Sequence, residues 1–130
     1  LDADLAIVDK RRSAPNQAKA MAVIGDVRDK TVVILDDMAD TAGTLTGAAD
    51  ALKENGAKEI HACCAHAVLS GPAIERISAS VMKSLVVTDT IPLRQNALAC
   101  DKIVVISISE LVGEAIIRSY RGDSVTSLFV

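Results

Sequence analysis

Residues 32–44 read VVILDDMADTAGT, and this stretch decides which fold and which site the sequence predicts. Four apolar residues, Val32–Leu35, run directly into the adjacent carboxylates of Asp36 and Asp37. Residues 40–44 then open a helical pattern. A buried strand that ends in carboxylates can hold a polyhydroxylated ligand or its metal ion, and the turn that follows offers backbone N–H groups, hydroxyls and a helix N-terminus to a phosphate. The stretch therefore predicts a site for a sugar phosphate.

The bulk composition excludes several classes of protein. The 130 residues predict a single domain, and a chain that is 50% hydrophobic but only 2% aromatic predicts an aliphatic core. A net charge of −3 argues against a nucleic-acid partner, which requires a basic surface. No apolar run approaches the roughly 20 residues of a membrane span, so no membrane partner is expected.

The cysteines and the first residues lead to two further expectations, one about the state of the thiols and one about the extent of the protein. Cys63, Cys64 and Cys100 are an odd number and form no disulfide framework, which favours buried, reduced thiols and a cytoplasmic protein. The chain starts at Leu1 and enters an apolar run almost at once, without an initiator methionine. We therefore expect it to be part of a longer protein.

Short apolar runs alternate with helical patterns along the chain. Most runs are continuous rather than alternating, which is typical of parallel strands covered on both faces. The runs cover residues 5–8, 32–35, 60–65, 85–88 and 103–108, with a weaker one at 21–27. The helical patterns cover 45–52, a segment opening at Pro72, and a segment from Ser107, at capping-box spacing from Glu110, to Gly122. This alternation predicts an α/β fold whose ligands bind at the carboxyl ends of the strands.

Residues 36–44 resemble the phosphoribosyl-binding loop of the phosphoribosyltransferases and of the related ribose-phosphate diphosphokinases. Further motifs, in the same order along nearly the whole chain, favour the diphosphokinases. They are Asp9-Lys10-Arg11-Arg12 with Pro15-Asn16, Gly25-Asp26-Val27, Ala65-His66 with Ser70-Gly71-Pro72-Ala73, VTDTIP at 87–92 and SVTSLF at 124–129. The resemblance is to the C-terminal half of that two-domain enzyme. It implies one phosphoribosyltransferase type I-like domain over residues 1–130, with a central, mostly parallel sheet flanked by helices.

The resemblance also implies roles for the residues of the loop. Asp36 and Asp37 would contact the ribose hydroxyls, directly or through Mg²⁺. The 5-phosphate of ribose 5-phosphate would be held by Asp40, Thr41, Ala42, Gly43 and Thr44. The competing interpretation is an acidic strand-to-helix turn with an ordinary cap, which would need neither the second aspartate nor the paired threonines.

Lys10 and Arg12 would be the catalytic pair of the family. The resemblance implies that they stabilise negative charge while a diphosphoryl group passes from MgATP to ribose 5-phosphate, giving phosphoribosyl diphosphate and AMP. Without the resemblance, a short basic run is usually a solvated surface. His66 follows an apolar run, and the choice between a general base and a histidine that satisfies its neighbours stays open.

The C-terminal residues carry a regulatory expectation. Ser124, Thr126 and Phe129 match positions that, in the allosteric class of the family, line a site for ADP or inorganic phosphate at a subunit interface. A short final strand with alternating polar and apolar residues is the alternative. The parent enzymes assemble through both halves, so a homo-oligomer is expected.

The sequence has no counterpart of the N-terminal half, which supplies most adenine contacts in the family. We therefore expect the chain alone to bind ribose 5-phosphate without turnover. A non-catalytic regulatory or assembly homologue and a phosphoribosyltransferase are the rival interpretations. The presence of Lys10 together with Arg12 argues against the first, and the lack of a visible hood for a nucleobase argues against the second.

Overall fold

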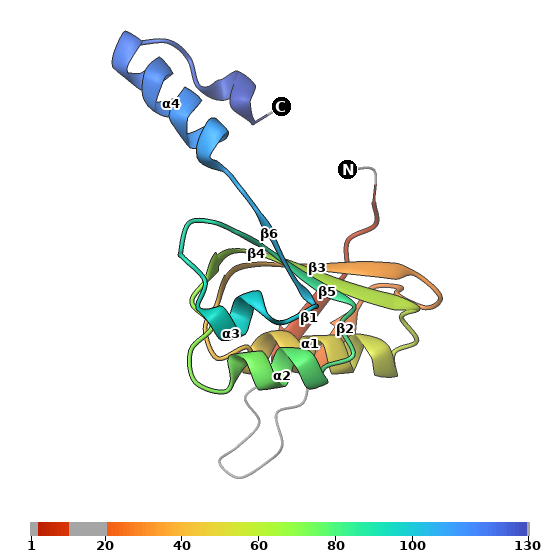
Figure 1. Cartoon of the computed structure of the whole chain (residues 1–130). Helices are drawn as coiled ribbons and strands as arrows, with labels where there is room; N and C mark the ends of the chain where they lie inside the picture. The colour runs from red at the N-terminus through yellow and green to blue at the C-terminus, as the bar shows by residue number, and fades with distance from the viewer. Residues whose placement is uncertain (1–2, 11–20, 130) are drawn as a thin grey trace.

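The computed structural model describes residues 3–10 and 21–129, with Lys10 described in its backbone only. Figure 1 shows the strand–helix alternation that the sequence predicts. In chain order the elements are β1 (Ile7–Lys10), β2 (Met21–Ile24), β3 (Thr31–Ala39), α1 (Gly43–Glu54), β4 (Glu59–Ala67), α2 (Ala73–Ala79), β5 (Ser84–Thr88), α3 (Gln95–Leu98), β6 (Ile103–Ile106), α4 (Ser109–Arg121) and the 3₁₀ helix η1 (Thr126–Leu128). The sequence did not predict α3, because one helical turn carries no periodic apolar stripe.

A four-stranded parallel sheet with the order β3-β4-β5-β6 forms the centre of the fold. Val32 pairs with Ile60, and Leu85 pairs with Ile103, so the predicted apolar runs lie side by side. The run at residues 5–8 does not join this sheet. It forms an antiparallel hairpin with β2, in which Ile7 pairs with Ile24. Neighbouring strands in sequence can close a hairpin locally, and the apolar pattern alone does not choose between the two pairings.

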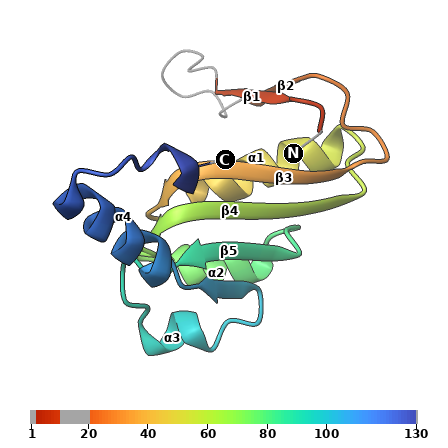
Figure 2. The ribbon, with the colours of Figure 1, turned by 90° about the horizontal axis from the view of Figure 1, so that it is seen from above.

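The core lies between the sheet and the helices α1, α2 and α3, which cover one face of it (Figure 2). The stripe predicted on the first helix is confirmed, because Leu45, Ala48, Ala49 and Leu52 are all buried. The largest fully buried side chains are Leu52, Ile60, Ile77, Met82, Leu85 and Val87. This aliphatic core fixes β3 and the start of α1, the two elements that carry the candidate site.

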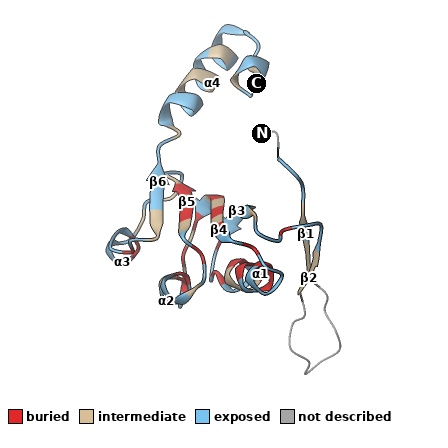
Figure 3. Ribbon diagram, turned by 90° about the vertical axis from the view of Figure 1, so that its right-hand side faces the viewer, coloured by how far each residue is buried: buried red, intermediate tan, exposed pale blue. Residues whose placement is uncertain are grey.

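The other face of the sheet is open, so the expectation of strands covered on both faces is wrong within the described residues (Figure 3). Val33 is 52% exposed and Leu35 is 75% exposed, although their neighbours Val32 and Ile34 pack against the core. The apolar pattern cannot distinguish a strand covered on both faces from one covered on a single face, because a continuous apolar run shows only that both faces are apolar.

Helix α4 stands away from the sheet and buries none of its residues (Figure 3). Its predicted end at Gly122 is confirmed, with φ 76° in the left-handed region that favours glycine. The predicted capping box is not formed: Ile108 occupies the N-cap, and the Ser107 hydroxyl accepts from the Ser109 N–H instead. The final strand considered for the C-terminus is also wrong, because that segment forms η1. In the described parts of the chain, no helix is long and apolar enough to cross a bilayer.

Candidate functional site

The candidate site lies where β3 ends and α1 begins. Asp36 and Asp37 are exposed near the carboxyl end of β3, and Ala39, the last residue of this strand, is buried. The Asp37 N–H donates to Asp36 Oδ1 at 2.9 Å, which fixes the orientation of the first carboxylate relative to the strand. Two exposed carboxylates therefore stand beside the turn that leads into the helix, as the sequence predicts.

The helix α1 begins without a capping side chain. Its N-cap residue is Ala42, buried and left-handed with φ 58°, and no side-chain hydrogen bond caps the helix. The carbonyl of Ala42 accepts from the N–H and from the hydroxyl of Thr46, both at 2.9 Å. Because the first N–H groups of an α-helix have no partner within the helix, an alanine cap leaves them for another acceptor. The side-chain cap that the competing interpretation requires is therefore not formed.

The loop between β4 and α2 holds the turn from one side. The N–H of Leu69 donates to the carbonyl of Ala39, and the N–H of Ser70 donates to the carbonyl of Asp40, each at 3.0 Å. The Ser70 hydroxyl also donates to Asp40 Oδ1. Asp40 thus serves to tie the two loops together, which explains a carboxylate in a turn that otherwise suits an anion.

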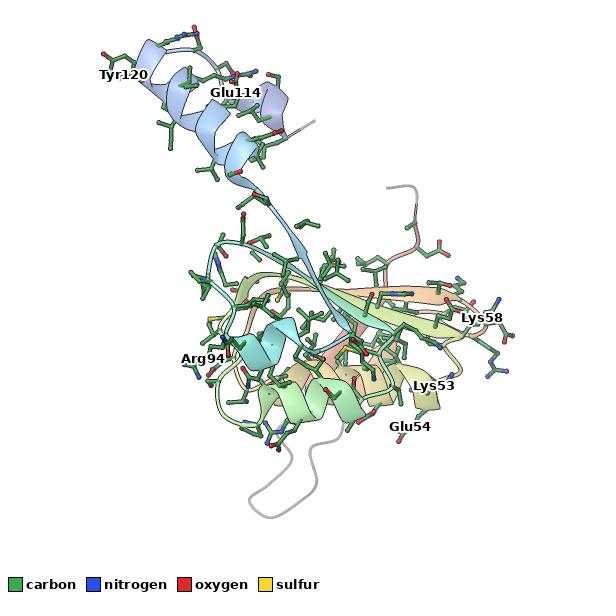
Figure 4. The ribbon with its side chains drawn as sticks, viewed as in Figure 1. Lys53, Glu54, Lys58, Arg94, Glu114 and Tyr120 are labelled. Carbon is green, nitrogen blue, oxygen red and sulfur yellow. The ribbon has the colours of Figure 1, made fainter. Side chains whose placement is uncertain are left out.

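An open hollow lies beside the first turns of α1. Among the residues that line it are Thr41, Gly43 and Thr44 from the turn and Arg76 from α2. Lys53 and Lys58, by contrast, lie at the opposite end of α1 (Figure 4). No local pattern in the sequence marks Arg76 as a site residue, because it reaches the turn from a helix far along the chain.

A neutral thiol lies on the next strand. Cys64 is the Cα partner of Asp36 in the parallel register and is 5% exposed. Burial raises the pKa of its thiol, and the nearby Asp36 carboxylate raises that pKa further. Cys63, Cys64 and Cys100 are all free, as the sequence predicts, although Cys63 is only half-buried.

His66 lies at the carboxyl end of β4 and is exposed. Its Nδ1 is 3.0 Å from the hydroxyl of Thr90, which also donates to the carbonyl of Ala65 at 2.9 Å. The partner of the imidazole is therefore a hydroxyl on the segment after β5. The Nδ1 of His61, on the same strand as His66, is 2.8 Å from the hydroxyl of Ser84.

Comparison with known proteins decides the family. A family model described as the phosphoribosyl synthetase-associated domain matches residues 5–130. The chain belongs to this family. It is 53% identical over 130 residues to a ribose-phosphate pyrophosphokinase of Nitrosomonas europaea, covering 100% of this chain and 41% of that protein. It is 55% identical over 129 residues to one of Bordetella pertussis, covering 99% of this chain and 42% of that protein.

The fold agrees with a solved structure of the same family. The crystal structure of phosphoribosylpyrophosphate synthetase from Mycobacterium smegmatis matches with a TM-score of 0.79 and 34% sequence identity, over 90% of this chain and 37% of that chain. The expected α/β class, with a parallel sheet flanked by helices, is confirmed. The chain corresponds to the C-terminal portion of these proteins and spans about 40% of the length of the relatives described above.

The catalytic pair expected from the family falls largely outside the described residues. Arg12, like Arg11, is not among them, and Lys10 is described only as the last residue of β1. Lys10 pairs with Met21, and a Cβ built on Gly47 of α1 would lie 3.2 Å from the Cε of Met21. The hairpin therefore ends beside the first half of α1, next to the candidate site.

The residues with the regulatory expectation lie together but apart from this site. The Ser124 hydroxyl donates to Thr126 Oγ1 at 3.2 Å, and Phe129 is 77% exposed. All three belong to the segment after α4, which Figures 1 and 3 show away from the β3–α1 turn. Within this chain they do not contribute to the candidate site.

Proposed function

We propose that this chain binds ribose 5-phosphate as the C-terminal part of a ribose-phosphate diphosphokinase, a transferase of nucleotide biosynthesis. The observation that carries the proposal is the start of α1, where a left-handed Ala42 leaves the helix uncapped beside Asp36 and Asp37. The 5-phosphate would accept from the N–H groups and hydroxyls of residues 41–44, with Asp40 holding the turn. The ribose hydroxyls would donate to the two carboxylates.

The donor set also suits Mg²⁺. No group of three metal-ligating side chains occurs among the described residues, so a cage made only of protein side chains is not supported there. Mg²⁺ in phosphoryl-transfer sites is usually held by one or two carboxylates together with substrate oxygens and water. Asp36 and Asp37 fit that mode. When bound, the ion would neutralise charge on the diphosphoryl group during transfer.

The complete reaction would use parts beyond this chain. In the proposal, Lys10 and Arg12 stabilise the diphosphoryl group that passes from ATP to the anomeric hydroxyl of ribose 5-phosphate. Because the chain spans about 40% of the relatives named above, we expect residues 1–130, as one domain, to bind the sugar phosphate but not to turn it over. The longer protein would form a homo-oligomer, with ADP or inorganic phosphate binding at Ser124, Thr126 and Phe129.

Calorimetric titration of ribose 5-phosphate into the chain with Mg²⁺ tests this proposal. We expect saturable binding, and a Thr44→Val variant about tenfold weaker because the hydroxyl, but little volume, is removed next to a dianion. Thr31→Val is the matched control, since Thr31 is exposed at the opposite end of β3. Failure of a folded chain to bind the sugar phosphate would contradict the proposal and favour a regulatory homologue.

A further inference from the structure

Arg76 reaches from the middle of α2 to the turn that precedes α1. Its Nη1 donates to the carbonyl oxygen of Thr41 at 2.9 Å, across 35 positions of sequence. A Cβ built on Gly43 would lie 3.1 Å from the same nitrogen, so the guanidinium lies directly against the first residue of the helix. A side chain at position 43 would therefore press against the guanidinium, and the crowding would grow with the size of that side chain.

The hydrogen bond to Thr41 fixes the peptide plane between Thr41 and Ala42. In a trans peptide the C=O and the following N–H point to opposite sides of the chain. Holding the Thr41 carbonyl on the α2 side therefore directs the Ala42 N–H to the other side. Ala42 is left-handed and the residues after it are helical, and successive N–H groups in such a turn form a concave site for an anion.

The guanidinium of Arg76 forms no ion pair with any residue that the structure describes. Among residues 3–10 and 21–129, no carboxylate lies within 4 Å of the guanidinium, and Asp50, which lines the same hollow, forms no ion pair with it. The side chain is exposed beside Thr41, Gly43 and Thr44. A positive charge left unpaired beside an anion site raises the local concentration of anions and stabilises the bound one.

The rest of the turn is held by different groups. The backbone bonds from Leu69 and Ser70 fix Ala39 and Asp40, and the Ser70 hydroxyl holds the Asp40 side chain. None of these contacts involves Thr41, whose carbonyl accepts the hydrogen bond from Arg76. Arg76 therefore holds the Thr41–Ala42 peptide, whereas the following peptide is held by Thr46 through the carbonyl of Ala42.

We propose that Arg76 is a positioning residue for the phosphate of the bound sugar phosphate. It holds the Thr41 carbonyl, and through it the Ala42 N–H, in the binding orientation, and its charge attracts the dianion. This inference rests on the proposed function and adds to it a residue from a different element. Arg76 thereby links the conformation of residues 40–44 to the position of α2.

Three variants of the chain test the role of Arg76: Arg76→Met, Arg76→Lys and, as a matched control, Arg121→Met, which removes an exposed arginine from the last turn of α4. Each is titrated with ribose 5-phosphate from about 20 to 200 mM salt, a range over which exposed charges become screened. We expect Arg76→Met to bind roughly 10- to 100-fold more weakly and to lose much of the salt dependence. Arg76→Lys keeps the charge and should recover part of the affinity, and Arg121→Met should match the wild type.

The outcomes separate this inference from the function on which it rests. If the wild type binds ribose 5-phosphate and Arg76→Met binds it with the same affinity and the same salt dependence, the role of Arg76 is overturned and the proposed function is left intact. A loss of affinity with an unchanged salt dependence and no recovery in Arg76→Lys would show a merely structural role and would also overturn the inference. Wild type that does not bind ribose 5-phosphate would overturn both. If Arg76→Met does not fold, the salt dependence of Arg76→Lys decides, because it should remain close to that of the wild type.

Discussion

Replacing Ile77 with alanine is expected to lower the free energy of unfolding by about 3 kcal/mol. Ile77 is 0% exposed in α2 and belongs to the core cluster between the helices and the sheet. Removing a buried aliphatic side chain loses its transfer free energy and leaves a cavity. Since small domains have a total stability of only about 5–15 kcal/mol, this change removes a large share of it. Urea unfolding followed by circular dichroism measures the difference.

Ile116→Ala is the matched control for that variant. Ile116 is also an isoleucine in a helix, but it lies on α4 and is 63% exposed. Its replacement should change stability by no more than about 0.5 kcal/mol. Equal losses in the two variants would contradict the structure, because they would mean that α4 is packed as tightly as α2.

Gly43→Val is expected to weaken binding of ribose 5-phosphate by about 100-fold or more, roughly 3 kcal/mol. A Cβ at this position meets Arg76 Nη1 at 3.1 Å, so the valine side chain must push the guanidinium away from the Thr41 carbonyl. Gly43 also lines the hollow at the start of α1, which the added methyl groups would narrow. Calorimetric titration against the wild type measures the loss.

Gly113→Val provides the control at a second helical glycine. A Cβ on Gly113, in α4, would meet nothing within 4 Å. This variant should therefore bind ribose 5-phosphate as the wild type does. Comparable thermal unfolding of the two variants would show that the expected loss in Gly43→Val comes from the site and not from the fold. Unweakened binding by Gly43→Val would place the ligand away from this hollow.

Local patterns predicted the elements that the core and the site require. The spacing of Leu45, Ala48, Ala49 and Leu52 marks the buried face of α1 because a helix repeats every 3.6 residues. The carboxylates of Asp36 and Asp37 follow an apolar run, so their place near the end of the strand follows from the sequence, although β3 continues beyond them to Ala39. These signals are local, since each depends only on residues within one element.

Contacts between distant residues could not be predicted in the same way. Arg76 and Ser70 lie 35 and 30 positions from the turn residues that they hold, and neither spacing is a local pattern. The apolar face of α4 is equally clear in sequence, but periodicity does not say what covers it. The hairpin of β1 with β2 likewise depends on a choice of partner that its apolar residues leave open.

Binding of the phosphate of ribose 5-phosphate at the start of α1 can be observed residue by residue. The most direct test is the amide spectrum of the ¹⁵N-labelled chain, recorded by nuclear magnetic resonance during titration with ribose 5-phosphate and, separately, with ribose. We expect the largest shifts at the N–H groups of Ala42, Gly43 and Thr44, and we expect that ribose without the phosphate does not produce them. Shifts confined to other parts of the chain, such as residues 124–129, or equal shifts with ribose, would contradict this expectation.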